Sequence, residues 1–376
     1  MEHYFDNSAT TKVCPEAAEA AMRAMCEVYG NPSSTHTKGR EAKKLLDGAR
    51  GQVAAAVGCK PGEIVFTSCG SESDNWALVG GAEAMARRGK HIISSAVEHD
   101  AVRRTLDELA RRGYEITLLT PDSTGAIRPE DVANALRNDT ILVSLMLVNN
   151  ETGAVTDISA ISRLLREAKS QALLHTDAVQ AFMKVPFTPG TLGADMISVS
   201  GHKIHAPKGI GALYIRDGLR LRPYIMGGAQ EAGRRAGTEA MPAIAAFGAA
   251  CETARLAMPE SAARMARLKK SIVERLGAQL PELEWIDTAA PHILSISLPG
   301  WRSEVLMNAL EAKEVYVSKS SACKKGGRSH VLEAIGLPAR VIDGALRIGL
   351  SRFTTEDDVQ ALCQALCQAH DTLAHR

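Results

Sequence analysis

The chain has 376 residues, more than a single hydrophobic core usually accommodates, so two domains are expected. Its 45% hydrophobic and 23% charged residues are ordinary for a globular protein and argue against disorder. A net charge of +1 and 4% aromatic residues offer neither the basic surface nor the stacking platforms typical of nucleic-acid binding, so we expect no nucleic-acid partner.

The start of the chain shows no basic segment followed by an apolar one, and no run of about 18 apolar residues occurs in the sequence. We therefore expect a cytoplasmic protein that does not contact a membrane. The eight cysteines are scattered without CxxC spacing, which predicts neither a zinc site nor a set of disulfides.

Strand and helix patterns alternate through the first two-thirds of the chain. After helical patterns at 16–29 and 39–57, strands are predicted at 64–66, 91–94, 115–119, 141–148, 172–175 and 196–199, most of them followed by a helix. Such alternation is typical of an α/β fold with a mainly parallel sheet and helices on both faces.

The last third of the chain has a different order. It reads as helices at 242–258 and 261–280, a strand at 293–298, a helix at 303–312, a loop with Cys323, a short helix at 331–335, a strand at 345–350 and a final helix from 355. This order predicts a small α+β domain. We expect a large domain over 13–257 and a small domain made of 1–12 and 258–376.

Lys203 follows the apolar run 196–199 directly and precedes a Pro/Gly turn. A lysine at a strand end can keep its amine partly desolvated with a lowered pKa, which is what a Schiff base with an aldehyde requires. Ser200 and His202 beside it are suited to a phosphate, although a solvated surface lysine would fit the same pattern. His202 and His205 could be read as a metal pair, but no acidic or cysteine ligand is adjacent, so we expect no metal.

Polar residues recur just after the carboxyl ends of the apolar runs. They are Ser71, His99, Asn150, Asp177, Gln180 and Lys203. In α/β sheets ligands bind outside the carboxyl ends of the strands, so these residues predict one site assembled from distant parts of the chain.

Three of these positions have both a functional and a structural interpretation. Gly70 and Ser71 lie at a strand-to-helix turn, where backbone N–H groups could hold an anion, or Ser71 could simply cap the helix. Asp177 could pair with a pyridinium nitrogen and keep it protonated, or it could cap a helix. His99 could stack on an aromatic ring or carry protons, or it could be structural.

A lysine, a phosphate cradle and a strand-end aspartate are the parts that a pyridoxal 5'-phosphate site needs. The sequence also resembles the cysteine desulfurases of the aminotransferase class V type, which serve iron–sulfur cluster assembly and nitrogenase maturation. The resemblance is carried by YFDNSATT at 4–11, GNPSSTH at 30–36, EIVFTSCGSESDN at 63–75, EH at 98–99, VNNETG at 148–153, HTDAVQ at 175–180, SVSGHKIHAPKGIGALY at 198–214, GGAQEAGRRAGT at 227–238, SSAC at 320–323, SHVL at 329–332 and LRIGLSRFTTEDDV at 346–359.

The resemblance implies a fold-type I pyridoxal-phosphate enzyme that acts as a homodimer. Lys203 would carry the cofactor, Asp177 would pair with its ring nitrogen, Gln180 would contact its ring hydroxyl, and His99 would stack on the ring and help to move protons. Gly70, Ser71, Ser200 and His202 would hold the phosphate, with Thr238 reaching in from the other subunit. Asn150 would serve both cofactor and substrate, and with Arg347 it would bind the substrate carboxylate.

Cys323 would be the nucleophile that takes sulfur from the substrate and holds it as a persulfide. Its surroundings favour that role independently, because Lys324 and Lys325 favour the thiolate and Gly326 and Gly327 would let the loop move. Two features depart from the family pattern: Ser320 stands where a glycine is usual, and the segment between Cys323 and SHVL is about two residues shorter than in long-loop members.

The leading hypothesis is a homodimeric enzyme that converts L-cysteine to L-alanine and passes sulfur from Cys323 to an acceptor such as an iron–sulfur scaffold protein. A selenocysteine lyase or an aminotransferase on the same fold is the alternative, and neither would depend on Cys323 to the same degree. A catalytically idle sulfur-carrier subunit is a third hypothesis, against which the presence of Lys203, Asp177 and His99 argues.

Overall fold

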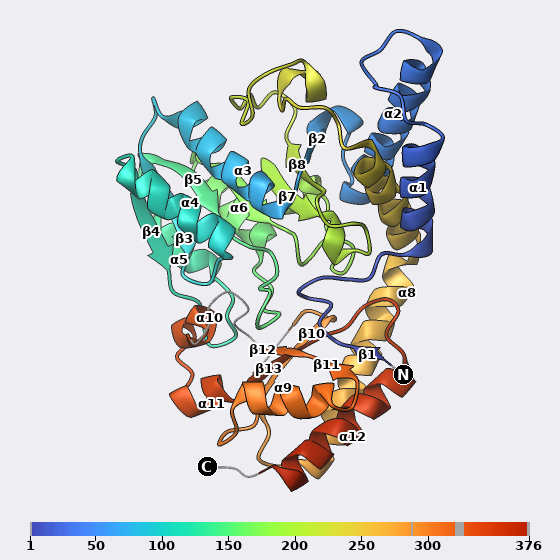
Figure 1. Cartoon of the computed structure of the whole chain (residues 1–376). Helices are drawn as coiled ribbons and strands as arrows, with labels where there is room; N and C mark the ends of the chain where they lie inside the picture. The colour runs from blue at the N-terminus through green and yellow to red at the C-terminus, as the bar shows by residue number, and fades with distance from the viewer. Residues whose placement is uncertain (1, 287–288, 320–326, 374–376) are drawn as a thin grey trace.

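The computed structural model describes residues 2–286, 289–319 and 327–373. They form two parts, each built on its own sheet, and helix α8 (Met241–Gln279) runs from one into the other (Figure 1). We call the part with the seven-stranded sheet the large half and the part with the four-stranded sheet the small half. No helix among the described residues is long and apolar enough to span a membrane.

The seven-stranded sheet is mainly parallel, as the sequence predicts. Its order is β2 (Ile64–Thr67), β8 (Gly211–Ile215), β7 (Met196–Ser200), β6 (Leu173–Asp177), β5 (Thr140–Ser144), β3 (His91–Ser95) and β4 (Glu115–Leu119). Only β8 is antiparallel to its neighbours β2 and β7. The carboxyl ends of the other six strands therefore meet at one edge of the sheet.

Helices cover both faces of this sheet, which explains why its inner strands are buried along their whole length. On one face α3 (Gly70–Met85) and α4 (Asp100–Arg111) bury residues such as Trp76 and Leu106. The other face packs against α5 (Pro129–Ala135), α6 (Ile158–Glu167), α7 (Pro189–Leu192) and the first part of α8. Helices α1 (Pro15–Cys26) and α2 (Thr37–Val57) lie against α8.

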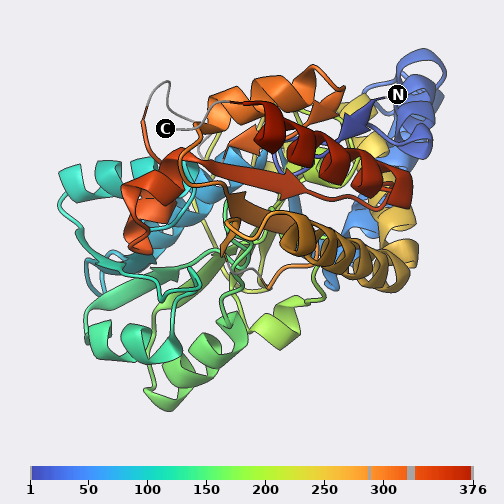
Figure 2. The ribbon, with the colours of Figure 1, turned by 90° about the horizontal axis from the view of Figure 1, so that it is seen from below.

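The small half contains an antiparallel sheet in the order β12 (Ser318–Lys319), β13 (Ala345–Gly349), β10 (Ile293–Ser297) and β9 (Glu284–Ile286). One face packs on α8, α9 (Ser303–Glu311) and α12 (Glu356–Thr372), which Figure 2 shows from below. Alternate residues of β13 and β10, including Arg347, point to the opposite face. Two short helices, α10 (His330–Ala334) and α11 (Ala339–Asp343), complete this half.

The N-terminal residues lie in the small half. There β1 (His3–Tyr4) pairs in parallel with β11 (Val315–Tyr316), and Asp6 bridges to Gly349. The domain boundaries at residues 12 and 257 stay a prediction.

The expected break between two helices at Pro259 is wrong, because α8 is continuous across this residue. A proline in a helix interior costs about 3 kcal/mol relative to alanine. The buried side chains of α8 continue on both sides of it, from Ile244 and Phe247 to Ile272 and Leu276. Burial of these side chains against both halves offsets the free-energy cost of the proline. The sequence pattern around Pro259 does not show that this burial occurs.

Candidate active site

A cavity of about 380 Å³ lies at the carboxyl edge of the large sheet, and residues of both halves line it. The sequence-predicted residues that line it are Gly70, Ser71, His99, Asn150, Asp177, Gln180, Ser200, His202, Lys203 and Arg347. Thr238 is exposed and does not line it. Cys323 and Ser320 fall outside the described residues.

Lys203 ends a single 3₁₀ turn, Gly201–Lys203, that directly follows β7. Its Nζ donates to the carbonyl oxygens of Ser8 at 2.6 Å and Ala9 at 2.7 Å, so the N-terminal segment holds the amine at the cavity wall. Burial, and next the charge of Lys203, lower the pKa of His202 to about 4. The imidazole of His202 is therefore neutral at pH 7.

The N-terminus of α3, with Gly70 and Ser71, lines the cavity at the position predicted to be a phosphate cradle. The helix begins at Gly70 with Cys69 as N-cap, so the alternative that Ser71 caps the helix is wrong. A Cβ on Gly70 would lie 2.8 Å from Val179 Cγ2, so glycine lets the chain approach closely there. The buried Ser200 hydroxyl nearby has no hydrogen-bond partner among the described residues. First-turn N–H groups and a free hydroxyl are what a phosphate would use.

Asp177 ends β6, and its Oδ1 accepts from the N–H of Val179 at 2.8 Å. The bond closes a local turn, and no helix begins among the described residues between β6 and α7, so the alternative that Asp177 caps a helix is wrong. The carboxylate lines the cavity. Burial raises the pKa of Asp177, so its negative charge is held there at a cost in free energy. A cation placed beside it would stabilise the ionised form.

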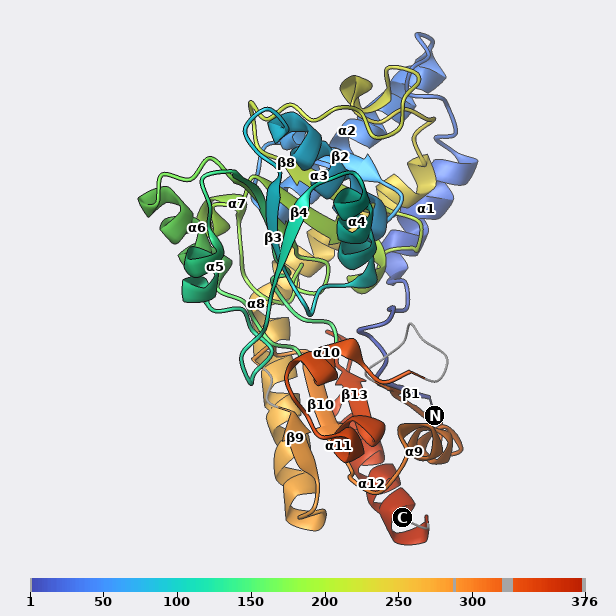
Figure 3. The same ribbon diagram turned by 90° about the vertical axis from the view of Figure 1, so that its left-hand side faces the viewer.

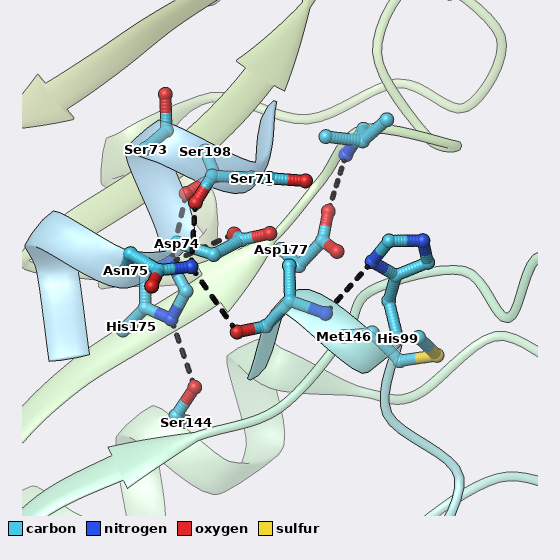
Figure 4. Close-up of polar contacts among 12 residues, drawn as sticks. Ser71, Ser73, Asp74, Asn75, His99, Ser144, Met146, His175, Asp177 and Ser198 are labelled. Atoms are coloured by element: carbon cyan, nitrogen blue, oxygen red, sulfur yellow. Dashed lines mark hydrogen bonds and ion pairs between the residues drawn. The ribbon is translucent and has the colours of Figure 1, made fainter. Parts of the chain in front are cut away.

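The sequence reasoning missed a buried polar cluster behind Asp177 (Figure 4). Asp74 of α3 lies there, and burial followed by the charge of Asp177 raises its pKa well above the usual range. His175 contacts Ser144 Oγ at 2.8 Å and Ser198 Oγ at 3.0 Å. Burial lowers the pKa of His175 to about 3, so its 3.7 Å approach to Asp74 is a polar contact rather than an ion pair.

His99 is the N-cap of α4, because its Nδ1 accepts from the N–H of Ala101 at 3.1 Å. The structural and functional interpretations of this residue are therefore compatible. With Nδ1 accepting, the ring hydrogen of the neutral tautomer is on Nε2.

Arg347 stands in the middle of β13 and is only 2% exposed. Its guanidinium donates to the carbonyl oxygen of Asn150 at 2.9 Å and to Asp6 Oδ1 at 3.1 Å. These contacts hold the positively charged guanidinium at the cavity. Its Nε, a hydrogen-bond donor, has no partner among the described residues. A carboxylate ligand suits this position.

Two buried acids, Glu98 and Glu151, also line the cavity and were given no role from the sequence. Glu98 Oε1 accepts from Ser95 Oγ at 2.6 Å and from the N–H of Met146 at 3.1 Å. Burial is the main cause that raises the pKa of Glu98 to about 8 and that of Glu151 to about 7. Glu98 therefore holds a proton at pH 7, whereas Glu151 is about half protonated.

The stability of the protein should reflect the proton on Glu98. Because the pKa of Glu98 rises from 4.5 to about 8 on folding, its contribution is full below 4.5 and is lost as the pH rises through 8. Glutamine stays neutral at every pH, so Glu98→Gln serves as the reference. The free energy of unfolding of the wild type, relative to that of Glu98→Gln, should fall by a few kcal/mol between about pH 4.5 and pH 8.5. Urea unfolding of the cofactor-free proteins measures this difference. A difference independent of pH would show that Glu98 is ionised when buried.

Known proteins match nearly the whole chain. The family model described as aminotransferase class-V matches residues 3–362. The chain is 41% identical over 368 residues to cysteine desulfurase IscS of Methanosarcina thermophila, covering 96% of this chain and 90% of that protein. It is also 41% identical to a cysteine desulfurase of a Nostoc species, covering 96% and 91%.

Solved structures match as extensively. A NifS-like protein superimposes with a TM-score of 0.94 at 37% identity, over 99% of this chain and 100% of that chain. A structure of SspA in complex with cysteine gives a TM-score of 0.81 at 32% identity, over 94% of this chain and 100% of that chain.

Proposed function

The chain belongs to the aminotransferase class-V family, and from this premise we propose how its own residues carry out the reaction. It is a pyridoxal 5'-phosphate-dependent cysteine desulfurase, which converts L-cysteine to L-alanine and transfers the sulfur to an enzyme cysteine as a persulfide. The residue roles rest chiefly on one observation: the Lys203 amine lies at the wall of a cavity that also contains a strand-end carboxylate and a helix N-terminus.

The residues at the cavity fit this cofactor. The N–H groups of Gly70 and Ser71, with Ser200 and His202, would hold its phosphate. Asp177 would pair with its ring nitrogen. An acceptor for the ring hydroxyl is present as well. The buried Oε1 of Gln180 has no partner among the described residues and could accept a hydrogen bond from that hydroxyl. The bound cofactor would withdraw electrons from the substrate α-carbon and so make its proton acidic.

The substrate would be held and deprotonated by groups of this chain. Arg347, helped by Asn150, would bind the cysteine carboxylate through two parallel hydrogen bonds that a lysine could not provide. Lys203 Nζ would take the α-proton of the substrate. His99, with its hydrogen on Nε2, would stack on the ring and serve as a nearby proton carrier.

Cys323 would receive the sulfur. Its thiolate would form a bond to the substrate sulfur while the substrate carbon–sulfur bond breaks. The carbon would keep the electron pair and take a proton, which leaves a persulfide on Cys323 and alanine as the product. A thiol acceptor then has to take the terminal sulfur. We propose a cytoplasmic enzyme that delivers this sulfur to a protein acceptor such as an iron–sulfur scaffold.

The proposal is tested by incubating the purified protein with one equivalent of L-cysteine and no reductant. We expect one alanine for each sulfur retained on the protein. Selenocysteine lyase activity would instead appear as turnover of L-selenocysteine with little turnover of L-cysteine. Aminotransferase activity would appear as a keto acid formed without sulfur release.

We further propose a homodimer in which Thr238 reaches the phosphate held by the neighbouring subunit. The segment 227–238 is held rigidly on its own subunit. Arg50 and Glu231 form a bidentate pair at 2.7 Å, and Arg235 pairs with Glu72 beside the cradle at 2.9 and 3.1 Å. This clamping would present the exposed Thr238 side chain outward from its own cavity.

Thr238→Ala should lower the affinity for pyridoxal phosphate about tenfold or more without changing the dimer, because a hydrogen bond to a charged group is worth about 1.5–3 kcal/mol. Cofactor titration and light scattering measure the two quantities. A wild-type monomer with full activity would rule out a shared site.

A further inference from the structure

The turn at residues 149–153, which we call the NNETG turn, joins the two halves at three points. Asn150 accepts from Arg347 on β13 at 2.9 Å, and Gly153 accepts from the N–H of Ala290, just before β10, at 2.9 Å. Between them Glu151 Oε2 accepts from Ser329 Oγ. Three separate stretches of the small half are thus bonded to one short turn of the large half.

The turn itself is rigid. Asn149 Oδ1 accepts from the N–H groups of Glu151 at 2.8 Å and Thr152 at 3.0 Å, and Asn149 Nδ2 donates to the carbonyl oxygen of Val97 at 3.1 Å. A side chain placed on such a turn has a defined position relative to the large sheet. Glu151 is therefore a fixed acceptor rather than a mobile one.

Ser329 makes two bonds through one hydroxyl. It donates to Glu151, and as the N-cap of α10 it accepts from the N–H of Leu332 at 3.1 Å. Both Glu151 and Ser329 are buried, at 5% and 2% exposure, so the contact is shielded from water. The next residue, His330, has Nε2 at 3.2 Å from the Glu98 carbonyl oxygen. Figure 3 shows α10 at the boundary between the two halves.

Ser329 lies six residues after Cys323 in the sequence. Six residues span at most about 20–22 Å when fully extended, so the position of Ser329 limits where the Cys323 thiol can be. A fixed Ser329 therefore defines the point from which this six-residue tether starts.

We propose that Glu151 is a positioning residue that, through Ser329, fixes the C-terminal end of the segment carrying Cys323 and so governs sulfur transfer rather than cysteine binding. This inference rests on the proposed function. The other charged groups near Glu151 are Asp100, Arg103 and Arg347. Among the described residues, neither Arg103 nor Arg347 donates to Glu151, whereas Ser329 does.

A matched control variant distinguishes two roles of Ser329: capping α10 and positioning the segment that carries Cys323. Ser297 is a buried serine of the small half whose hydroxyl donates to the Val341 carbonyl oxygen at 2.7 Å and so ties β10 to α11. Ser297→Ala removes a comparable buried bond without touching the NNETG turn.

The test compares Glu151→Ala, Ser329→Ala, the double variant and Ser297→Ala in the holoenzyme. Each Glu151 or Ser329 variant should slow single-turnover alanine formation about tenfold or more, because small misplacement of a reacting group is costly. The double variant should be no slower than either single one, since both act through one contact. KM for cysteine should not rise, and Ser297→Ala should transfer sulfur at the wild-type rate.

Two further readouts separate positioning from loss of folding, and the first does not depend on sulfur transfer. Amide hydrogen exchange in the peptide 327–337 should be about threefold faster or more in Glu151→Ala than in Ser297→Ala, with or without cofactor. Glu151→Gln should restore most of the transfer rate, because its Oε1 can still accept from Ser329.

The inference is overturned if Ser329→Ala transfers sulfur as fast as Ser297→Ala, or if Glu151→Gln is as slow as Glu151→Ala. A wild-type protein that forms no alanine from cysteine would instead overturn the proposed function. The two failures are therefore distinguishable.

Discussion

Lys203→Ala is expected to give a folded protein that binds no cofactor covalently and forms no alanine from cysteine. No other lysine lines the active-site cavity among the described residues, and the Lys203 amine lies at its wall. Loss of the amine removes both the covalent anchor and the group that takes the α-proton, so activity should fall by orders of magnitude.

Lys184 provides a demanding control. It is buried, burial lowers its pKa to about 7, and with Lys203 it lines a separate cavity of about 20 Å³. A neutral amine there could compete for an aldehyde. Lys184→Met should keep a borohydride-reducible cofactor adduct, and Lys203→Ala should lose it. An adduct retained in Lys203→Ala would show that the anchor is misassigned.

Cys323→Ala is expected to bind cofactor and cysteine normally but to lose nearly all alanine formation, because no thiolate remains to accept the sulfur. Spectral titration with cysteine checks binding, and single-turnover alanine formation checks transfer. Retained alanine or hydrogen selenide formation from L-selenocysteine would favour a lyase, and an intact transamination half-reaction would favour an aminotransferase.

Cys69 is the competing thiol. It is the cysteine that lines the cavity among the described residues, at the N-cap of α3. Cys69→Ala should still accumulate a persulfide on Cys323. Persulfide that disappears in this variant and persists in Cys323→Ala would place the nucleophile on α3.

The α/β architecture and most of the cavity lining could be predicted from the sequence because both depend on local signals. The inner strands are buried over their whole length, so they read as apolar runs, and the ligand-facing residues follow where those runs stop. Lys203 and Asp177 illustrate this directly.

Other parts of the site depend on long-range packing that local patterns do not report. Asp74 and His175 acquire shifted pKa values only because burial places them behind Asp177. Glu151 and Ser329 are 178 residues apart, and each alone resembles an ordinary polar loop residue. The continuity of α8 through Pro259 likewise arises from burial against both halves.

The central claim is most directly tested by mass spectrometry of the protein after reaction with one equivalent of L-cysteine in the absence of reductant. The account predicts one added sulfur atom on the peptide containing Cys323, with one alanine released for each modified chain. Alanine without sulfur on that peptide, or sulfur on a peptide lacking Cys323, would contradict it.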